Sequence, residues 1–155
     1  MTTKASPEEF QAVEAKVKEL LQAIQLDVNL ESETQEDRLY FNVSGPDARI
    51  FLNNREETLR SITLLLHTWR QKAFPDSEMD IKFDANRVLF EREKEVRAQA
   101  FSALDEIKQP GDEVVLEPMN PYERRMVHMA LVDHDHIVTE SLGDSHMKRV
   151  VVRHK

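Results

Sequence analysis

The sequence contains no cysteine. Disulfide bonds and thiolate metal sites are therefore excluded, and an intracellular, reducing compartment is the default expectation. Apolar runs are also short, because stretches such as 62–66 and 150–152 fall far below the roughly 20 residues of a membrane-spanning helix. Residues 1–7 lack the apolar core of a secretory signal. These absences predict a soluble, cytoplasmic protein that does not contact a membrane.

Sequence motifs that would indicate catalysis are missing as well. There is no glycine-rich phosphate loop, no Gly-x-Ser-x-Gly turn and no His-Glu-x-x-His helix. Asp133-His134-Asp135-His136 alternates residue types that can bind metals, which leaves a metal-dependent enzyme as a distant alternative. A polar loop between a helix and a strand explains this run more simply. We therefore predict a protein without enzymatic activity that needs no metal or other cofactor.

Charge is distributed unevenly along the chain. The 155 residues carry a net charge of −8, which by itself argues against binding nucleic acid. Residues 119–155, however, hold six lysines and arginines against five acidic residues, a net +1 that leaves −9 for residues 1–118. Five of the six histidines also lie in 119–155 and can become positively charged on mild acidification. This asymmetry indicates two modules with different tasks.

The N-terminal half shows patterns in the order helix, strand, strand, helix, helix, strand. Ser6, Pro7 and Glu9 form a helix start with a capping box. Apolar spacing then predicts the following segments: a helix at 7–25, strands at 26–31 and 38–43, a short helix at 48–52, a longer helix from about residue 56, and a strand at 79–83. On the longer helix, the expected buried residues are Leu59, Ile62, Leu65, Leu66 and Trp69.

The C-terminal half begins with a long helix at 86–108, which ends at Gln109-Pro110-Gly111. The patterns after it predict a strand at 114–116, a helix at 120–132 and a hairpin of 137–141 with 147–153. The expected fold class is α/β, of the α+β type, with modules at residues 1–84 and 85–155.

The helix at 120–132 carries the most distinctive group of side chains. Asn120 is expected to cap it, with Pro121 in its first turn and Glu123 completing a capping box. Arg124 and His128 then stand one helical turn apart. Tyr122 and Arg125 lie beside them. Guanidinium and imidazole groups suit phosphate and nucleobases, although a solvated helix face with a locally bonded His128 is the commoner meaning of this spacing.

Three runs of residues in this half resemble a known family: 118–131, which reads PMNPYERRMVHMAL, 138–141 (VTES) and 148–152 (KRVVV). They are similar to the R-x-x-x-H single-stranded nucleic-acid-binding domain, in the form found in the bacterial Jag family, also called SpoIIIJ-associated or KhpB proteins. In that family a K-homology (KH) domain of the type II order precedes the R-x-x-x-H domain. The element order of residues 1–84 is similar to that type II order.

The resemblance places the residues that name the motif at Arg124 and His128, and the basic residues of the closing strand at Lys148 and Arg149. It implies that these side chains contact single-stranded RNA or DNA, and Arg125 and Tyr122 are candidates for the same surface. Lys148 and Arg149 have a second interpretation as solvated charges on an edge strand, where they would discourage strand pairing.

The first module departs from the KH pattern at its phosphate-binding loop. KH domains have a Gly-x-x-Gly loop, whose missing side chains let the nucleic-acid backbone approach closely. The resemblance aligns that loop with Asn53, Asn54, Arg55 and Glu56, so both glycines are absent and Glu56 adds a negative charge. Asn53 could still adopt a left-handed conformation. We expect weak or no RNA binding by this loop, and a role for the module in packing or protein contacts.

The sequence therefore predicts a bacterial protein that binds single-stranded nucleic acid, with RNA favoured, through its C-terminal module. The resemblance implies a regulator of the Jag type, linked to cell elongation, division and post-transcriptional control, with a second small KH protein or self-association as a protein contact. The rival prediction is a protein-interaction adaptor with little affinity for nucleic acid.

Overall fold

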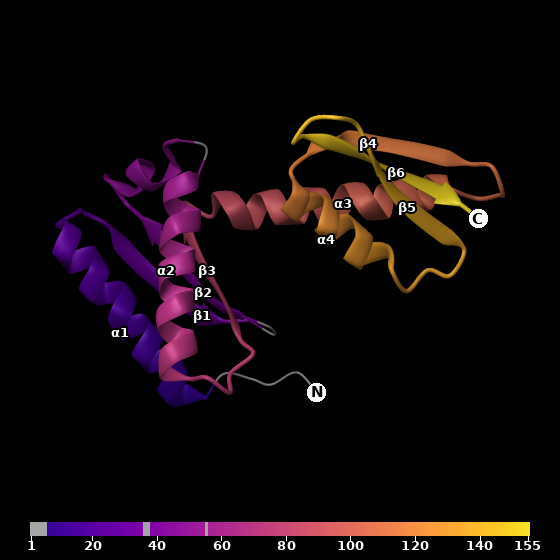
Figure 1. Cartoon of the computed structure of the whole chain (residues 1–155). Helices are drawn as coiled ribbons and strands as arrows, with labels where there is room; N and C mark the ends of the chain where they lie inside the picture. Colours follow the sequence, from indigo (N-terminus) through magenta and orange to yellow (C-terminus); the bar gives the residue numbers. More distant parts are fainter. Residues whose placement is uncertain (1–5, 36–37, 55) are drawn as a thin grey trace. The chain divides into compact units, whose positions relative to one another are not determined.

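The computed structural model describes residues 6–35, 38–54 and 56–155. The chain divides into two compact units, residues 1–89 (unit 1) and residues 90–155 (unit 2). The elements, in order, are α1 (Pro7–Ile24), β1 (Asn29–Thr34), β2 (Arg38–Ser44), the 3-10 helix η1 (Ala48–Leu52), α2 (Glu57–Ala73), β3 (Asp80–Ala85), α3 (Val88–Glu106), β4 (Glu113–Met119), α4 (Pro121–Leu131), β5 (Ile137–Leu142) and β6 (Lys148–His154). They are labelled in Figure 1.

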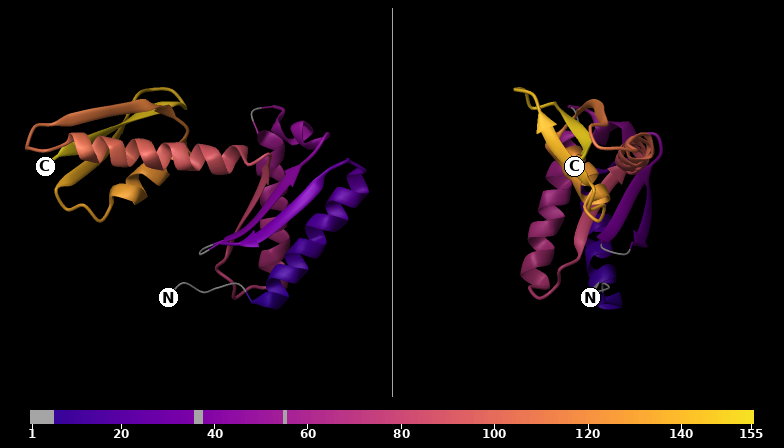
Figure 2. Two further views of the ribbon diagram at one scale, coloured as in Figure 1. Left: turned by 180° about the vertical axis from the view of Figure 1, so that it is seen from behind. Right: turned by 90° about the vertical axis from the view of Figure 1, so that its right-hand side faces the viewer.

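Unit 1 is a three-stranded sheet with helices packed on one face. The strand order is β1-β2-β3, with β1 antiparallel and β3 parallel to β2. Alternate residues of β2 and β3, among them Phe41 and Phe83, meet Val13 and Val17 of α1 and Leu59 of α2 in one core. Figure 2 shows the same elements from behind. The predicted order of helices and strands in this half is confirmed.

The opposite face of this sheet holds a buried polar network. Asp84 has no solvent exposure and accepts hydrogen bonds from the Tyr40 hydroxyl (2.7 Å) and from the Ala85 and Leu89 amides (2.7 and 3.1 Å). Burial and the neighbouring Asp84 carboxylate raise the pKa of Tyr40, so its hydroxyl stays protonated. Buried polar groups on β2 and β3 therefore satisfy one another and hold the start of α3.

Several predicted details of unit 1 were wrong. The first strand begins at Asn29 instead of residue 26, because Gln25 is left-handed and Val28 bonds to Leu26 in a turn. Glu9 accepts a hydrogen bond from Ser77, and Ser6 caps α1 without a reciprocal bond. Leu65 is 57% exposed, because the buried row of α2 runs through Leu59, Leu66 and Arg70.

Unit 2 is a second three-stranded antiparallel sheet, in the order β4-β6-β5, with α3 and α4 contributing to a single core. Val150 and Val152 of β6 meet Val96 and Ala100 of α3 and Val127 of α4. The long helix starts at Val88 instead of residue 86. Asn86 and Arg87 have left-handed backbones, which a right-handed helix cannot contain.

Candidate nucleic-acid interface

The start of α4 is fixed by the predicted capping box. The Glu123 amide donates to the Asn120 side chain (3.0 Å), and the Asn120 amide donates to the Glu123 carboxylate (2.8 Å). The buried Glu123 carboxylate also accepts from Arg92 Nε of α3 at 2.6 Å. Because the helix register is locked at its first turn, the directions of Arg124 and His128 are well defined.

Arg124 joins the ends of two strands to α4. Its Nη1 donates to the carbonyl oxygens of Met119, at the end of β4, and His146, in the turn before β6, at 3.0 Å each. Within the described part of the chain, its Nε and Nη2 make no hydrogen bond. Arg124 is therefore both a structural link and a guanidinium with donors left for a ligand.

His128 bridges α4 and β5. Its Nδ1 is hydrogen-bonded to the Thr139 hydroxyl, and its Nε2 lies 3.3 Å from the Ser141 hydroxyl. Burial, and to a lesser extent the nearby Arg124 charge, lower the pKa of His128. The ring is therefore neutral at pH 7, with one nitrogen donating and the other accepting. The local hydrogen bonding that the sequence offered as the simpler interpretation is present, and the side chain is still partly exposed.

Thr139 and Ser141 are site residues that the sequence reasoning did not assign. They point from β5 toward α4, while Val138 and Leu142 of the same strand are exposed. A half-buried strand ordinarily has the reverse arrangement, with apolar side chains inward. This inversion was visible in the sequence and could have marked β5 as part of a polar site.

Lys148 and Arg149 lie on opposite faces of the sheet. Lys148 pairs with Met119 and shares the face of Val150, on the side of the helices. Arg149 points to the other face and donates to the Leu116 carbonyl at 3.2 Å. Of the two basic residues, only Lys148 is at the sheet end and on the face where Arg124 bonds to Met119 and His146.

Arg125 and Tyr122 occupy the outer side of α4. Arg125 is exposed, and Tyr122, 52% exposed, donates from its hydroxyl to Glu93 of α3 at 2.9 Å. The structure therefore brings together Arg124, His128 and Lys148, which we call the α4–β6 site. Arg125 and Tyr122 adjoin it along the helix.

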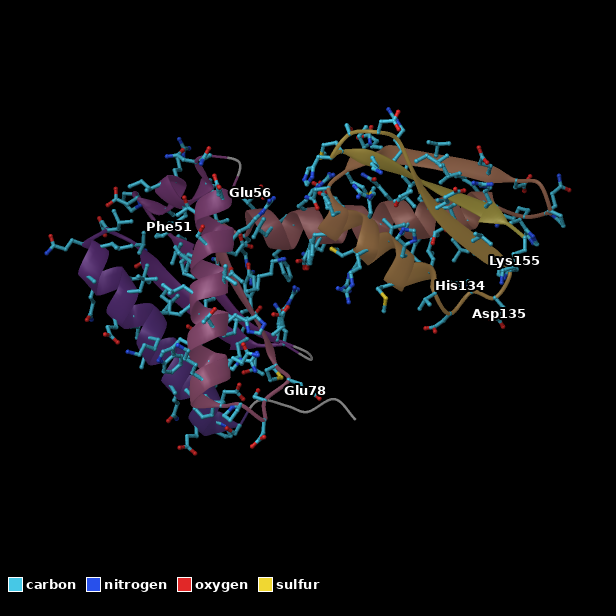
Figure 3. The ribbon with its side chains drawn as sticks, viewed as in Figure 1. Phe51, Glu56, Glu78, His134, Asp135 and Lys155 are labelled. Carbon is cyan, nitrogen blue, oxygen red and sulfur yellow. The ribbon has the colours of Figure 1, made fainter. Side chains whose placement is uncertain are left out.

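The loop aligned with Gly-x-x-Gly joins η1 to α2 in unit 1 (Figure 3, Glu56 labelled). Asn53 has an extended backbone, while Asn54 and Glu56 are left-handed, with φ of 56° and 63°. The left-handed conformation proposed for Asn53 thus occurs at its neighbours instead. Arg55 lies outside the described residues. Glu56 keeps a backbone shape that favours glycine while presenting a carboxylate.

No group of three or more His, Asp or Glu side chains among the described residues is arranged to hold a metal ion, and this includes His134 and His136. No helix in the described ranges is long and apolar enough to cross a membrane.

Comparison with known proteins bears on unit 2 first. The model of the R-x-x-x-H domain family matches residues 94–154. These residues form an R-x-x-x-H domain. The resemblance drawn from Arg124 and His128 is thereby confirmed at the level of the domain, while the roles of the individual residues are not tested by it.

Two bacterial proteins match a longer part of the chain. RNA-binding protein KhpB of Clostridium symbiosum is 30% identical over 127 residues, which cover 82% of this chain and 57% of that protein. RNA-binding protein KhpB of Bacillus subtilis (strain 168) is 23% identical over 117 residues, which cover 74% of this chain and 56% of that protein. The chain thus spans little more than half the length of these relatives. Similarity to KhpB is confirmed, and the KH assignment of unit 1 stays a prediction.

The low pKa of His128 leads to a pH prediction. Its folded-state pKa is below the usual value of about 6.5, so between these two values the unfolded chain binds more protons. We expect the stabilisation from neutral His128 to be complete above about pH 6.5 and to be lost as pH falls from there through the folded-state pKa. Ring-proton NMR against pH should show His128 titrating below a histidine in an unstructured peptide. Titration above that reference would contradict this assignment.

Proposed function

We propose that this protein binds single-stranded nucleic acid, preferentially RNA, through the α4–β6 site of its R-x-x-x-H domain. The observation that carries the proposal is the geometry of Arg124, whose fixed Nη1 leaves Nε and Nη2 for a phosphate. The names of the two KhpB relatives support RNA as the ligand. Binding involves no chemistry, and the protein acts as a cytoplasmic bacterial regulator of the Jag type.

In this proposal, Arg124 and Lys148 contact phosphate at one end of the sheet, and His128 contributes a hydrogen bond or stacking surface from its exposed edge. Arg125 and Tyr122 extend the contact along the outer side of α4. Arg149 faces away and serves the Leu116 carbonyl. The net charge of −8 then repels polyanions elsewhere, which confines binding to this surface.

We further propose that unit 1 is a divergent KH-like domain that contributes protein contacts instead of RNA contacts. The supporting observations are its order of elements, the acidic Glu56 in the loop, and the exposed Leu64 and Leu65 side chains on α2. A second small KH protein or another copy of this chain is the partner that the family resemblance implies. If no RNA binding is found, the adaptor function becomes the better account of both units.

The test is a titration of labelled single-stranded RNA and DNA at several salt concentrations, using Lys148→Ala and Arg149→Ala as a matched pair. Each phosphate contact contributes about 0.7 to the slope of log affinity against log salt for single strands. We expect Lys148→Ala to lower that slope by about this amount and Arg149→Ala to leave it unchanged. Equal effects of the two variants, or salt-independent binding, would overturn the proposed surface.

A further inference from the structure

Three histidines gather at the end of the unit 2 sheet that is farthest from Arg124. The rings of His136 and His154 are 5.4 Å apart, and those of His134 and His136 are 6.2 Å apart. Figure 3 labels His134, Asp135 and Lys155 at this end of the unit. We call His134, His136 and His154 the histidine cluster. Its members come from the turn after α4, the start of β5 and the end of β6, so the fold itself assembles them.

The histidine cluster lies in line with the α4–β6 site. Along β6, Lys148, Val150, Val152 and His154 share one face, because alternate residues of a strand point the same way. Lys148 and His154 therefore stand at the two ends of one face, separated by six residues, or roughly 20 Å. His128 lies between them, over Thr139 and Ser141. The helix-facing edge of the sheet thus carries basic or imidazole groups along its whole length.

The surroundings of the cluster contain charges of both signs. The His154 amide donates to the Asp112 carbonyl (3.1 Å), and the Asp112 carboxylate accepts from the Lys108 and Gln109 amides (2.8 and 3.0 Å). These amides, more than any charge, lower the pKa of Asp112 and keep it ionised. Asp133, Asp135 and Lys155 are exposed beside the rings, while the Arg153 side chain points to the other face and pairs with Glu113 and Glu140.

We propose that the histidine cluster is a second phosphodiester subsite, which engages the same RNA strand when its rings are protonated and so makes binding tighter under mildly acidic conditions. The proposal rests on the proposed function of the α4–β6 site. Rings 5 to 6 Å apart repel one another once charged, and an intervening phosphate relieves that repulsion. Binding therefore takes up protons. The close spacing of three imidazoles, which an isolated surface histidine lacks, is what favours a multivalent anion here.

The first test follows each histidine ring by NMR against pH, with and without a short oligouridylate. We expect the pKa values of His134, His136 and His154 to rise when the oligonucleotide is bound. His146, an exposed histidine of the same unit outside the cluster, should show no such change. Unchanged titration of all three cluster rings would overturn the proposal, and this result does not depend on any variant folding.

The second test compares affinity at about pH 8 and pH 6, where unperturbed histidine changes charge. The wild-type chain should bind oligouridylate roughly tenfold more tightly at pH 6, from two or three added ion pairs of ordinary exposed strength. The triple variant His134→Gln/His136→Gln/His154→Gln should keep the affinity at pH 8 and lose this gain, while the control His146→Gln keeps it. A triple variant with the full gain would contradict the subsite. Binding absent at both pH values would instead overturn the proposed function itself.

Discussion

Replacing Arg124 with alanine is expected to weaken binding of single-stranded RNA by roughly tenfold to a hundredfold, since hydrogen bonds to a charged group are worth about 1.5–3 kcal/mol. Arg124 supplies a rigid guanidinium whose Nη1 is already fixed by the Met119 and His146 carbonyls. A ligand therefore meets donors that need little further ordering. Fluorescence anisotropy with labelled oligouridylate at moderate salt measures the loss.

Two further variants separate charge, geometry and folding. Arg124→Lys keeps the positive charge but lacks the planar fork, so it should recover only part of the affinity. Arg60→Ala removes the same charge from the exposed side of α2 in unit 1 and should have little effect. If Arg124→Ala binds as well as the wild-type chain, or if Arg60→Ala is equally impaired, the site assignment fails.

The largest effect on stability is expected for Asp84→Ala, which should lower the free energy of unfolding of unit 1 by about 3 kcal/mol or more. The substitution leaves the buried Tyr40 hydroxyl and the Leu89 amide without their acceptor. Trp69, the single tryptophan of the chain, lies on α2 in unit 1. Its fluorescence during urea unfolding therefore reports on this unit separately from unit 2.

The controls for Asp84→Ala come from the same unit. Tyr40→Phe removes one hydrogen bond of the network and should cost about 1 kcal/mol. Asp76→Ala removes an exposed carboxylate outside the network and should stay within about 0.5 kcal/mol of the wild-type chain. A loss for Asp84→Ala no larger than that for Asp76→Ala would show that the network does not stabilise unit 1.

Local chemistry made part of the structure predictable. The Asn120 and Glu123 capping box depends on residues three apart in sequence, and it forms as expected. The same holds for the order of elements, since apolar spacing determines which segments can bury a face. Boundaries were less predictable. The first strand begins three residues late because Gln25 and Val28 are held by a cap and a turn, and their bonds depend on neighbours that a spacing pattern does not include.

The site was predictable in its helix and much less so in its sheet. Arg124 and His128 follow from helical spacing, whereas their partners Met119, Thr139 and Ser141 lie on strands brought in by the fold. Grouping Lys148 with Arg149 overlooked that neighbours on a strand face opposite ways. The histidine cluster needed the pairing of β5 with β6, because His136 and His154 are far apart in sequence.

The most direct test of the central claim is to follow the backbone amide NMR shifts of the whole chain while a short single-stranded oligouridylate is added. We predict that the shifting amides lie in the first turns of α4, along β5 and at the start of β6 around Lys148, while the loop around Asn54 and Glu56 stays unchanged. Shifts confined to unit 1, or to the face of the unit 2 sheet that carries Arg149, would contradict the α4–β6 site.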